Sequence, residues 1–139
     1  MPPSLDMLEI SAEELIERLL TRPESVVVVD VRDSDQFGGQ IRGCISAPST
    51  SLYGTALKEL VDRLSSVPLI VFHCMKSQVR GPKAMQRYAM AAYRPGSSSQ
   101  VALLTFGFEN FIRVAIRHSQ REILLEKIDE RIWPNSLLL

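Results

Sequence analysis

Short runs of aliphatic residues alternate along this chain with longer segments in which apolar residues recur every three to four positions. The clearest runs are 26–30, 69–72 and 101–104, and they are as short and as rich in Val, Ile and Leu as strands buried on both faces. Parallel strands of this kind are connected through helices. The alternation therefore predicts right-handed β-α-β units, a mainly parallel sheet and helices on both of its faces.

Amphipathic spacing predicts the helices between these strands. A capping box from Ser11 to Glu14 begins a short helix before the first run. Further apolar stripes predict helices around residues 52–64, 84–92, 108–116 and 122–133. Residues 45–47 are a candidate for an additional short strand that ends at Pro48.

Length and composition exclude several classes of protein. The 139 residues match the usual size of one domain, which we expect to span 1–139 with its core between about 7 and 133. The 16 basic and 16 acidic residues cancel, so no basic field exists to hold nucleic acid or an anionic membrane. No apolar run approaches the ~20 residues of a membrane-spanning helix, and residues 1–6 do not resemble a secretory signal.

The cysteine content indicates a reducing location. Two cysteines are too few for a disulfide scaffold or a cysteine-rich zinc site, and the two histidines add no metal-ligand spacing. We therefore expect a cytoplasmic protein with no bound metal, whose thiols are available for chemistry.

The segment that carries candidate chemistry follows the run 69–72, where ligands of parallel sheets bind. The backbone N–H groups of the turn from Cys74 to Arg80 can point toward a common centre and bind an anion there. The N-terminus of the next helix, which has Pro82 in its first turn, completes this anion site. Arg80 adds a planar charged fork that matches a tetrahedral oxyanion. The same positive surroundings favour a thiolate at Cys74, which makes that residue the candidate nucleophile.

Other residues of this segment have supporting roles in the hypothesis. The predicted oxyanion-binding loop consists of Met75, Lys76, Ser77, Gln78 and Val79. Ser77 either donates to the Cys74 thiolate or faces solvent, and His73 orients the loop through hydrogen bonds in preference to donating a proton. Cys44 has no acid or base near it in sequence and is expected to pack in the interior. The structural alternative for Cys74 is a buried cysteine beside a surface arginine.

These residues resemble the rhodanese-like superfamily, in its branch with His-Cys-x5-Arg loops. That branch contains the cell-cycle dual-specificity phosphatases and the eukaryotic arsenate and antimonate reductases. Further segments agree with this resemblance. Residues 28–33 and 37–48 resemble the family's strand-Asp-x-Arg and Gly-His-Ile-x-Gly-Ala pattern, and residues 104–108 resemble the glycine-containing turn that the family has before its final helices. The resemblance implies a five-stranded, mainly parallel central sheet flanked by helices on both faces.

The sequence also departs from the family pattern. Val31 stands where the cell-cycle phosphatases carry a second, protective cysteine, and Val79 replaces the acidic residue that they place before the arginine. No general acid is evident; Asp30 and Asp33 are candidates, although Asp30 is also expected to cap its strand and pair locally.

The resemblance implies thiol-dependent reduction of arsenate or antimonate without a bound cofactor. Cys74 attacks arsenic while Arg80 and the loop amides hold its oxygens; glutathione, the co-substrate, then adds, and glutaredoxin or a second thiol releases the trivalent oxyanion. The same residues serve a tyrosine or dual-specificity phosphatase acting on phosphotyrosine peptides, because phosphate esters and arsenate share shape and charge. A sulfurtransferase, whose loops are one residue shorter, and a non-catalytic rhodanese-like binding module, which usually lacks the Cys or the Arg, are the remaining alternatives.

Overall fold

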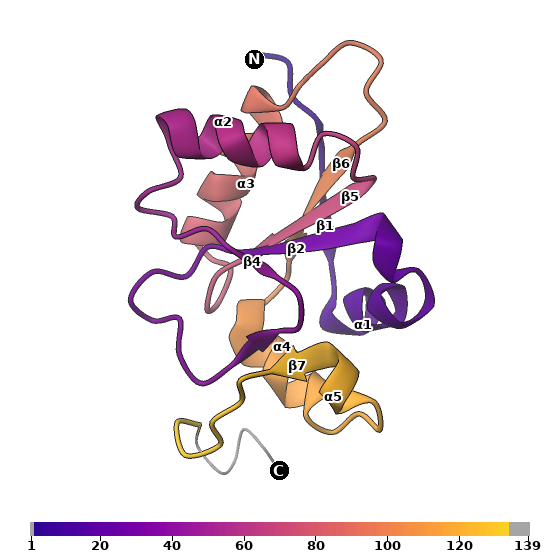
Figure 1. Cartoon of the computed structure of the whole chain (residues 1–139), viewed down its shortest axis with the longest axis vertical. Coiled ribbons are helices and arrows are strands. Elements are labelled where there is room, and N and C mark those ends of the chain that lie inside the picture. The colour runs from indigo at the N-terminus through magenta and orange to yellow at the C-terminus, as the bar shows by residue number, and fades with distance from the viewer. Residues whose placement is uncertain (1, 134–139) are drawn as a thin grey trace.

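A computed structural model describes residues 2–133 of the chain (Figure 1). The predicted domain, 1–139, also includes Met1 and residues 134–139, which lie outside the described residues. Five strands form the central sheet: β1 (Asp6–Ile10), β2 (Val26–Asp30), β4 (Ile45–Ser46), β5 (Leu69–His73) and β6 (Gln100–Leu104). All of their pairings are parallel, in the order β1-β6-β5-β2-β4.

Helices connect these strands largely where the apolar stripes predict them. They are α1 (Ala12–Thr21), the short 3-10 turn Pro23–Ser25, α2 (Gly54–Arg63), α3 (Arg80–Ala91), α4 (Gly107–Ala115) and α5 (Arg121–Leu124). The capping box is formed at α1, where Ser11 Oγ accepts from the Glu14 N–H at 3.0 Å and Glu14 Oε1 accepts from the Ser11 N–H at 3.0 Å.

The predicted helix over 122–133 is wrong. Helix α5 ends at Leu124, and strand β7 (Leu125–Glu126) follows and pairs antiparallel with β3 (Gln40–Ile41). Arg42 explains the change, because its guanidinium donates to the carbonyl of Glu122 at 2.7 Å and to that of Leu125 at 3.3 Å. A continuing helix would need these carbonyls for its own hydrogen bonds.

Strand β1 has no counterpart among the sequence expectations. It lies at the edge of the sheet and pairs with β6, so its side chains Met7 and Leu8 remain 39% and 43% exposed. A half-exposed edge strand lacks the continuous apolar run that marks the central strands. Its five residues therefore carry little signal in the sequence.

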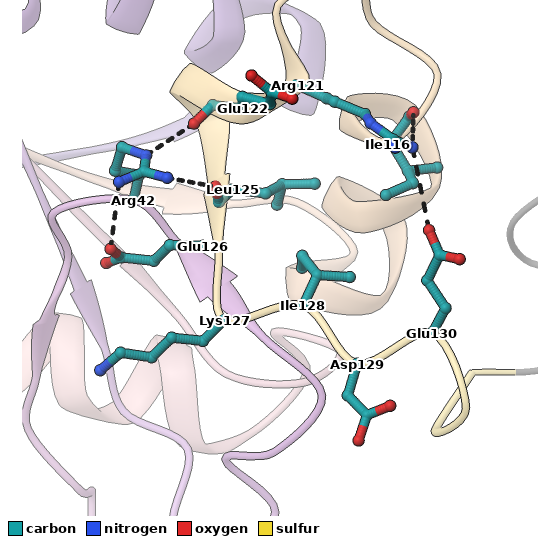
Figure 2. Close-up of a pocket in the computed structure, with 10 residues that line it drawn as sticks. All are labelled: Arg42, Ile116, Arg121, Glu122, Leu125, Glu126, Lys127, Ile128, Asp129 and Glu130. Atoms are coloured by element: carbon teal, nitrogen blue, oxygen red, sulfur yellow. Dashed lines mark hydrogen bonds and ion pairs between the residues drawn. The ribbon is translucent and has the colours of Figure 1, made fainter.

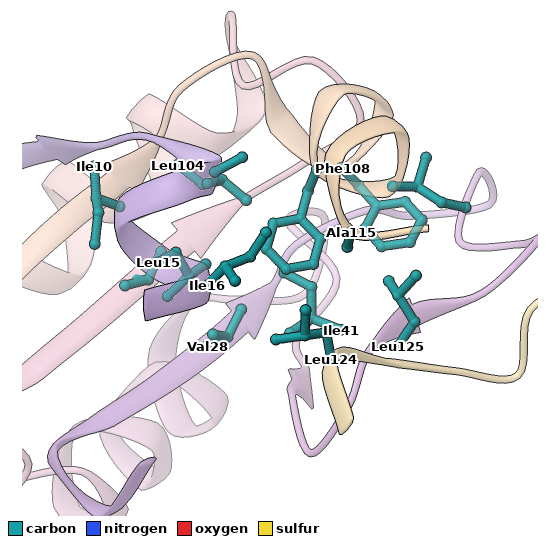
Figure 3. Close-up of a cluster of buried hydrophobic side chains, with 14 of the residues drawn as sticks. Ile10, Leu15, Ile16, Val28, Ile41, Leu104, Phe108, Ala115, Leu124 and Leu125 are labelled. Carbon is teal, nitrogen blue, oxygen red and sulfur yellow. The ribbon is translucent and has the colours of Figure 1, made fainter. Parts of the chain in front are cut away.

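The central strands bury both faces, as predicted. Val71 and Ala102 pack with α1, α4 and α5 in one cluster, whereas Ile70 and Phe72 pack with α2 and α3 in the other. Figure 3 shows part of the first cluster, including Val28 and Leu104 of the sheet and Phe108 of α4. Figure 1 shows the same two layers, with α2 and α3 on one side of the sheet and α1, α4 and α5 on the other. The α/β class with a five-stranded parallel sheet flanked on both faces is thus confirmed.

This topology determines where a site can form. Strands β2, β5 and β6 are parallel neighbours, so the loops that follow their carboxyl ends, 31–39, 74–79 and 105–106, lie along one edge of the sheet. Within residues 2–133, no helix combines the length and the apolar character needed to cross a membrane.

Candidate active site

Cys74 lies at the floor of the loop that connects β5 to α3, at the predicted edge of the sheet. Its side chain is buried, and its Sγ accepts hydrogen bonds from the backbone N–H of Ser77 at 3.2 Å and of Gly81 at 3.3 Å. Two N–H donors aimed at one sulfur stabilise negative charge on it.

Two residues in left-handed conformations shape the loop. Ser77 has φ 56°. Its hydroxyl is buried and has no hydrogen-bond partner among the described residues, so it neither donates to Cys74 nor faces solvent. The backbone N–H of Ser77 donates to the sulfur instead. Gly107 has φ 65°, and a Cβ there would clash with the carbonyl oxygen of Met75, which excludes any side chain at this position. The N–H groups of Phe108 and Glu109 donate to the carbonyls of Cys74 and Met75, both at 3.0 Å. The first turn of α4 therefore holds the carbonyl side of the loop.

A cavity of about 320 Å³ opens above the loop. It is lined by Asp35, Cys74, Met75, Lys76, Gln78, Val79 and Arg80. Every predicted loop residue except Ser77 thus contributes to its wall. Asp35, which the sequence interpretation did not single out, is the acidic residue of this lining.

Arg80, the first residue of α3, forms a two-bond ion pair with Asp35 across this cavity. Its Nη1 donates to Asp35 Oδ1 at 2.7 Å and its Nη2 to Oδ2 at 2.6 Å, while Nη1 also lies 3.4 Å from Asp33 Oδ2. These hydrogen bonds from Arg80 lower the pKa of Asp35 to about 2 and raise the pKa of Arg80 itself. The fork that the hypothesis assigns to an oxyanion is therefore occupied by a carboxylate of the same chain.

Replacing Asp35 with Asn is expected to strengthen the binding of inorganic phosphate roughly three- to tenfold, because a competing charge on the partly exposed fork is removed. The inhibition constant for phosphate measures this effect. Asp62→Asn, which breaks an exposed pair with Lys58 on α2, is the matched control and should leave the constant unchanged. Weaker phosphate binding in the Asp35→Asn protein would contradict the competition.

The two aspartates that the sequence proposed as general acids are both engaged elsewhere. Asp33 accepts from Ser49 Oγ at 2.6 Å and from the Thr50 N–H at 3.1 Å. Burial raises its pKa, but the hydrogen bonds from Ser49, Thr50 and Arg80 outweigh burial and leave the pKa below its usual value. Asp33 is therefore a carboxylate that holds the 49–50 turn.

Asp30 is fully buried and paired with Arg32, whose Nη2 donates at 2.7 Å. Burial raises the pKa of Asp30, but the neighbouring His73 and the hydrogen bonds and charge of Arg32 together outweigh burial and leave the pKa below its usual value. Arg32 also donates to the Gly39 carbonyl at 2.8 Å and lies 4.3 Å from the centre of the Phe108 ring. The local pairing expected for Asp30 is thus present, and through Arg32 it ties the 31–39 loop to α4.

His73 lies beneath the loop and contacts its first peptide. Its Nδ1 is 3.1 Å from the carbonyl oxygen of Cys74 and 4.0 Å from Asp30 Oδ1, and its ring stacks on Phe108 with the centroids 5.9 Å apart. Complete burial lowers its pKa, which favours the neutral ring with Nδ1–H donating to the carbonyl. This geometry supports an orienting role.

The buried His73 predicts a loss of stability on mild acidification. Its pKa in the folded protein lies below the ~6.5 of an unfolded histidine, so only the unfolded state takes up a proton as the pH falls below ~6.5. The free energy of unfolding should fall by up to about 1.4 kcal/mol per pH unit through this residue. Denaturant titrations at pH 7.5 and 5.5 would test this, and an equal pH slope in His73→Gln would contradict it.

Cys44 is half-buried beside β4 and is not near the nucleophile. It packs against the cluster on the α1 and α4 side of the sheet, whereas Cys74 belongs to the cluster on the α2 and α3 side. Burial raises the pKa of Cys44 to about 12, so it is a protonated thiol at neutral pH. Both cysteines are free. Packing, as the sequence predicts, accounts for Cys44.

Cys44→Ala is accordingly expected to retain most thiol-dependent activity and to lose no more than about 1 kcal/mol of stability. Multiple-turnover assays, denaturant unfolding and mass spectrometry of the oxidised wild type measure these effects. A Cys44–Cys74 disulfide formed during turnover, with activity lost in the Ala protein, would make Cys44 the resolving thiol.

A cavity of about 480 Å³ lies away from this loop, between the β3–β7 ribbon and α5 (Figure 2). Both of its arginines are paired with carboxylates of the same lining: Arg42 with Glu126 at 3.7 Å and Arg121 with Glu130 at 4.0 Å. None of its lining residues belongs to the Cys74–Arg80 loop. Among residues 2–133, no three His, Cys, Asp or Glu side chains gather as a metal site requires.

Comparison with known proteins finds relatives named as phosphatases and relatives named as arsenate or antimonate reductases. No protein-family model matches the chain. The dual specificity phosphatase ibp1 of Schizosaccharomyces pombe is 37% identical over 75 residues, which are 54% of this chain and 54% of that protein. The chain thus spans about half of the length of this curated relative.

Solved structures match over more of the chain. The As-Sb reductase of Leishmania major is 35% identical, with a TM-score of 0.71 over 78% of this chain and 79% of that one. A yeast protein tyrosine phosphatase of the rhodanese family is 26% identical, with a TM-score of 0.81 over 93% of this chain and 98% of that one. With its parallel sheet and a loop of the His-Cys-x5-Arg form at the sheet edge, the chain belongs to the rhodanese-like superfamily, in the branch of the arsenate and antimonate reductases and the Cdc25-related phosphatases.

Proposed function

We propose that this protein is a thiol-dependent reductase of arsenate or antimonate that uses Cys74 as its nucleophile. The observation that best supports this proposal is that the Cys74 sulfur lies at the floor of an open cavity, where it accepts two backbone N–H hydrogen bonds and lies beside Arg80. The 35% identity to an As-Sb reductase over 78% of the chain supports the choice of substrate. Arg80 and the amides of residues 75–79 hold the oxyanion, and His73 orients the loop.

The reaction proceeds in two balanced steps. The Cys74 thiolate displaces one oxygen of H₂AsO₄⁻, which leaves as water after taking up a proton, and a sulfur–arsenic(V) bond forms. Glutathione then forms a disulfide with Cys74, and the electron pair of the broken sulfur–arsenic bond passes to arsenic, which leaves as As(III) in H₂AsO₃⁻. The two sulfurs supply the two electrons. Glutaredoxin or a second glutathione reduces the disulfide and restores the thiol.

A side-by-side assay tests the proposal. The purified protein receives arsenate or antimonate with glutathione and glutaredoxin, a phosphotyrosine mimic, or thiosulfate with cyanide. We expect formation of the trivalent oxyanion that requires glutathione and becomes faster with glutaredoxin. Without glutathione, the reaction should stop after the single event that forms the sulfur–arsenic(V) bond, and no trivalent oxyanion should be released. Thiocyanate formation alone would replace the proposal with a sulfurtransferase, and activity in none of the three would leave a binding module.

A second activity, hydrolysis of phosphotyrosine, is favoured by the coverage of 98% of a yeast tyrosine phosphatase. The pKa values of Asp30, Asp33 and Asp35 are all lowered, so these carboxylates are not proton donors at neutral pH. Aryl esters leave as phenolates of pKa ≈10 and depend least on a donor. Aryl phosphates are therefore the expected substrates, ahead of phosphoserine and phosphothreonine.

The proposed partners follow from this chemistry. They are a small oxyanion or phosphotyrosine peptide, glutathione and glutaredoxin. The reaction requires a reduced Cys74, which places it in a reducing compartment such as the cytoplasm.

A further inference from the structure

A second cavity, of about 400 Å³, adjoins the cavity over Cys74. It is lined by Lys76, Gln78, Phe106, Glu109, Asn110 and Arg113. Lys76 and Gln78 line both cavities, so the two meet at the predicted oxyanion loop. The volume is within the range of pockets that hold small molecules, about 300–1,000 Å³.

The second cavity differs from the larger one in how its charged side chains are paired. Lys76, Glu109 and Arg113 form no ion pair within residues 2–133. In the larger cavity, by contrast, Arg42 and Arg121 are both paired with carboxylates. Among the described residues, the second cavity therefore presents two unpaired cations, one unpaired carboxylate and the two amides of Gln78 and Asn110.

Phe106 forms the apolar part of the same wall. It has φ 64°, a conformation that costs free energy for a residue with a bulky side chain, and 73% of it is exposed. Contacts of Phe106 within the described residues therefore offset little of the free-energy cost of this conformation. Strained, exposed residues of this kind cluster at ligand sites.

We propose that this cavity binds glutathione, the thiol that the reductase proposal requires, and the inference rests on that proposal. Glutathione carries two carboxylates, one ammonium group and two peptide bonds. The cations Lys76 and Arg113 match its carboxylates, Glu109 matches its ammonium group, and the amides match its peptide bonds. Phe106 covers its aliphatic stem. A tripeptide held here lies beside the mouth of the cavity over Cys74, where its thiol must form the disulfide that releases As(III).

Charge reversal at Arg113 tests the site. Arg113→Glu should raise the KM for glutathione roughly three- to tenfold, because one attraction becomes a repulsion, and high salt should shrink the difference. The kcat/KM for an aryl phosphate should remain within twofold of the wild type. Dithiothreitol, an uncharged thiol, should reduce both proteins equally well. Arg117→Glu, with the same charge change two residues beyond the end of α4, should behave as the wild type.

A binding measurement separates this inference from the reductase proposal. S-methylglutathione cannot react, and in NMR titration it should shift the amide resonances of residues 106–113. Asn tolerates the left-handed conformation, so Phe106→Asn should not lower the melting temperature. Because the substitution removes the aromatic side chain from the cavity wall, it should weaken the binding of S-methylglutathione.

The outcomes of the two experiments are distinct. Absence of the shifts, or an equal loss of activity with dithiothreitol in Arg113→Glu, would overturn the site. Binding of S-methylglutathione by a protein that forms no arsenite would leave the site and overturn the reductase function.

Discussion

Cys74→Ser should retain the fold and lose both reductase and aryl phosphatase turnover by several orders of magnitude. A serine hydroxyl is not ionised at neutral pH, and it cannot form the sulfur–arsenic bond or the disulfide that carries the two electrons. The serine oxygen can still accept from the Ser77 and Gly81 N–H groups, so the loop should keep its shape. Circular dichroism and thermal unfolding check the fold, and steady-state assays check both activities.

Cys44→Ser is the matched control, since it makes the same chemical change at the other cysteine. Its activity should stay close to that of the wild type. Iodoacetamide should label Cys74, and phosphate or arsenate should protect it, as peptide mass spectrometry would show. Residual reductase activity above a tenth of the wild-type rate in Cys74→Ser would falsify the assignment of the nucleophile.

Arg80→Lys should lower kcat/KM roughly 30- to 1000-fold, or about 2–4 kcal/mol of transition-state stabilisation. A guanidinium holds two oxygens at once, as it already does with the two oxygens of Asp35 at 2.7 and 2.6 Å. An ammonium group keeps the charge and loses this two-point geometry.

Arg87→Lys on the same helix is the control for Arg80→Lys. Arg87 also forms more than one contact, with the Leu52 carbonyl at 3.2 Å and the Tyr53 hydroxyl at 2.8 Å, but it does not line the cavity over Cys74. Its replacement should change kcat/KM less than threefold. If Arg80→Lys also remains within threefold of the wild type, charge alone suffices and the two-oxygen geometry is not needed.

The central strands, helices α1 to α4 and the sheet edge at which the candidate site lies were predictable from sequence. Strands β2, β5 and β6 are continuous apolar runs because both of their faces are buried, and the Cys74–Arg80 loop is a contiguous segment between one such run and a helix. Such features can be predicted from sequence because they depend on residues that are close together along the chain. The contact of His73 with the carbonyl of Cys74 is local in the same sense, since the two residues are adjacent.

Only the tertiary structure determined the remaining parts of the site. Asp35 reaches Arg80 from a loop 45 residues earlier, and Gly107, the first residue of α4, lies against Met75. Arg42 is a further long-range contact. It donates hydrogen bonds to the carbonyls of Glu122 and Leu125, and α5 therefore ends where the periodicity predicts a longer helix. Periodicity and motif spacing report on neighbours along the chain, whereas these contacts exist because parallel strands bring their carboxyl ends to one edge and because the β3–β7 ribbon pairs distant segments.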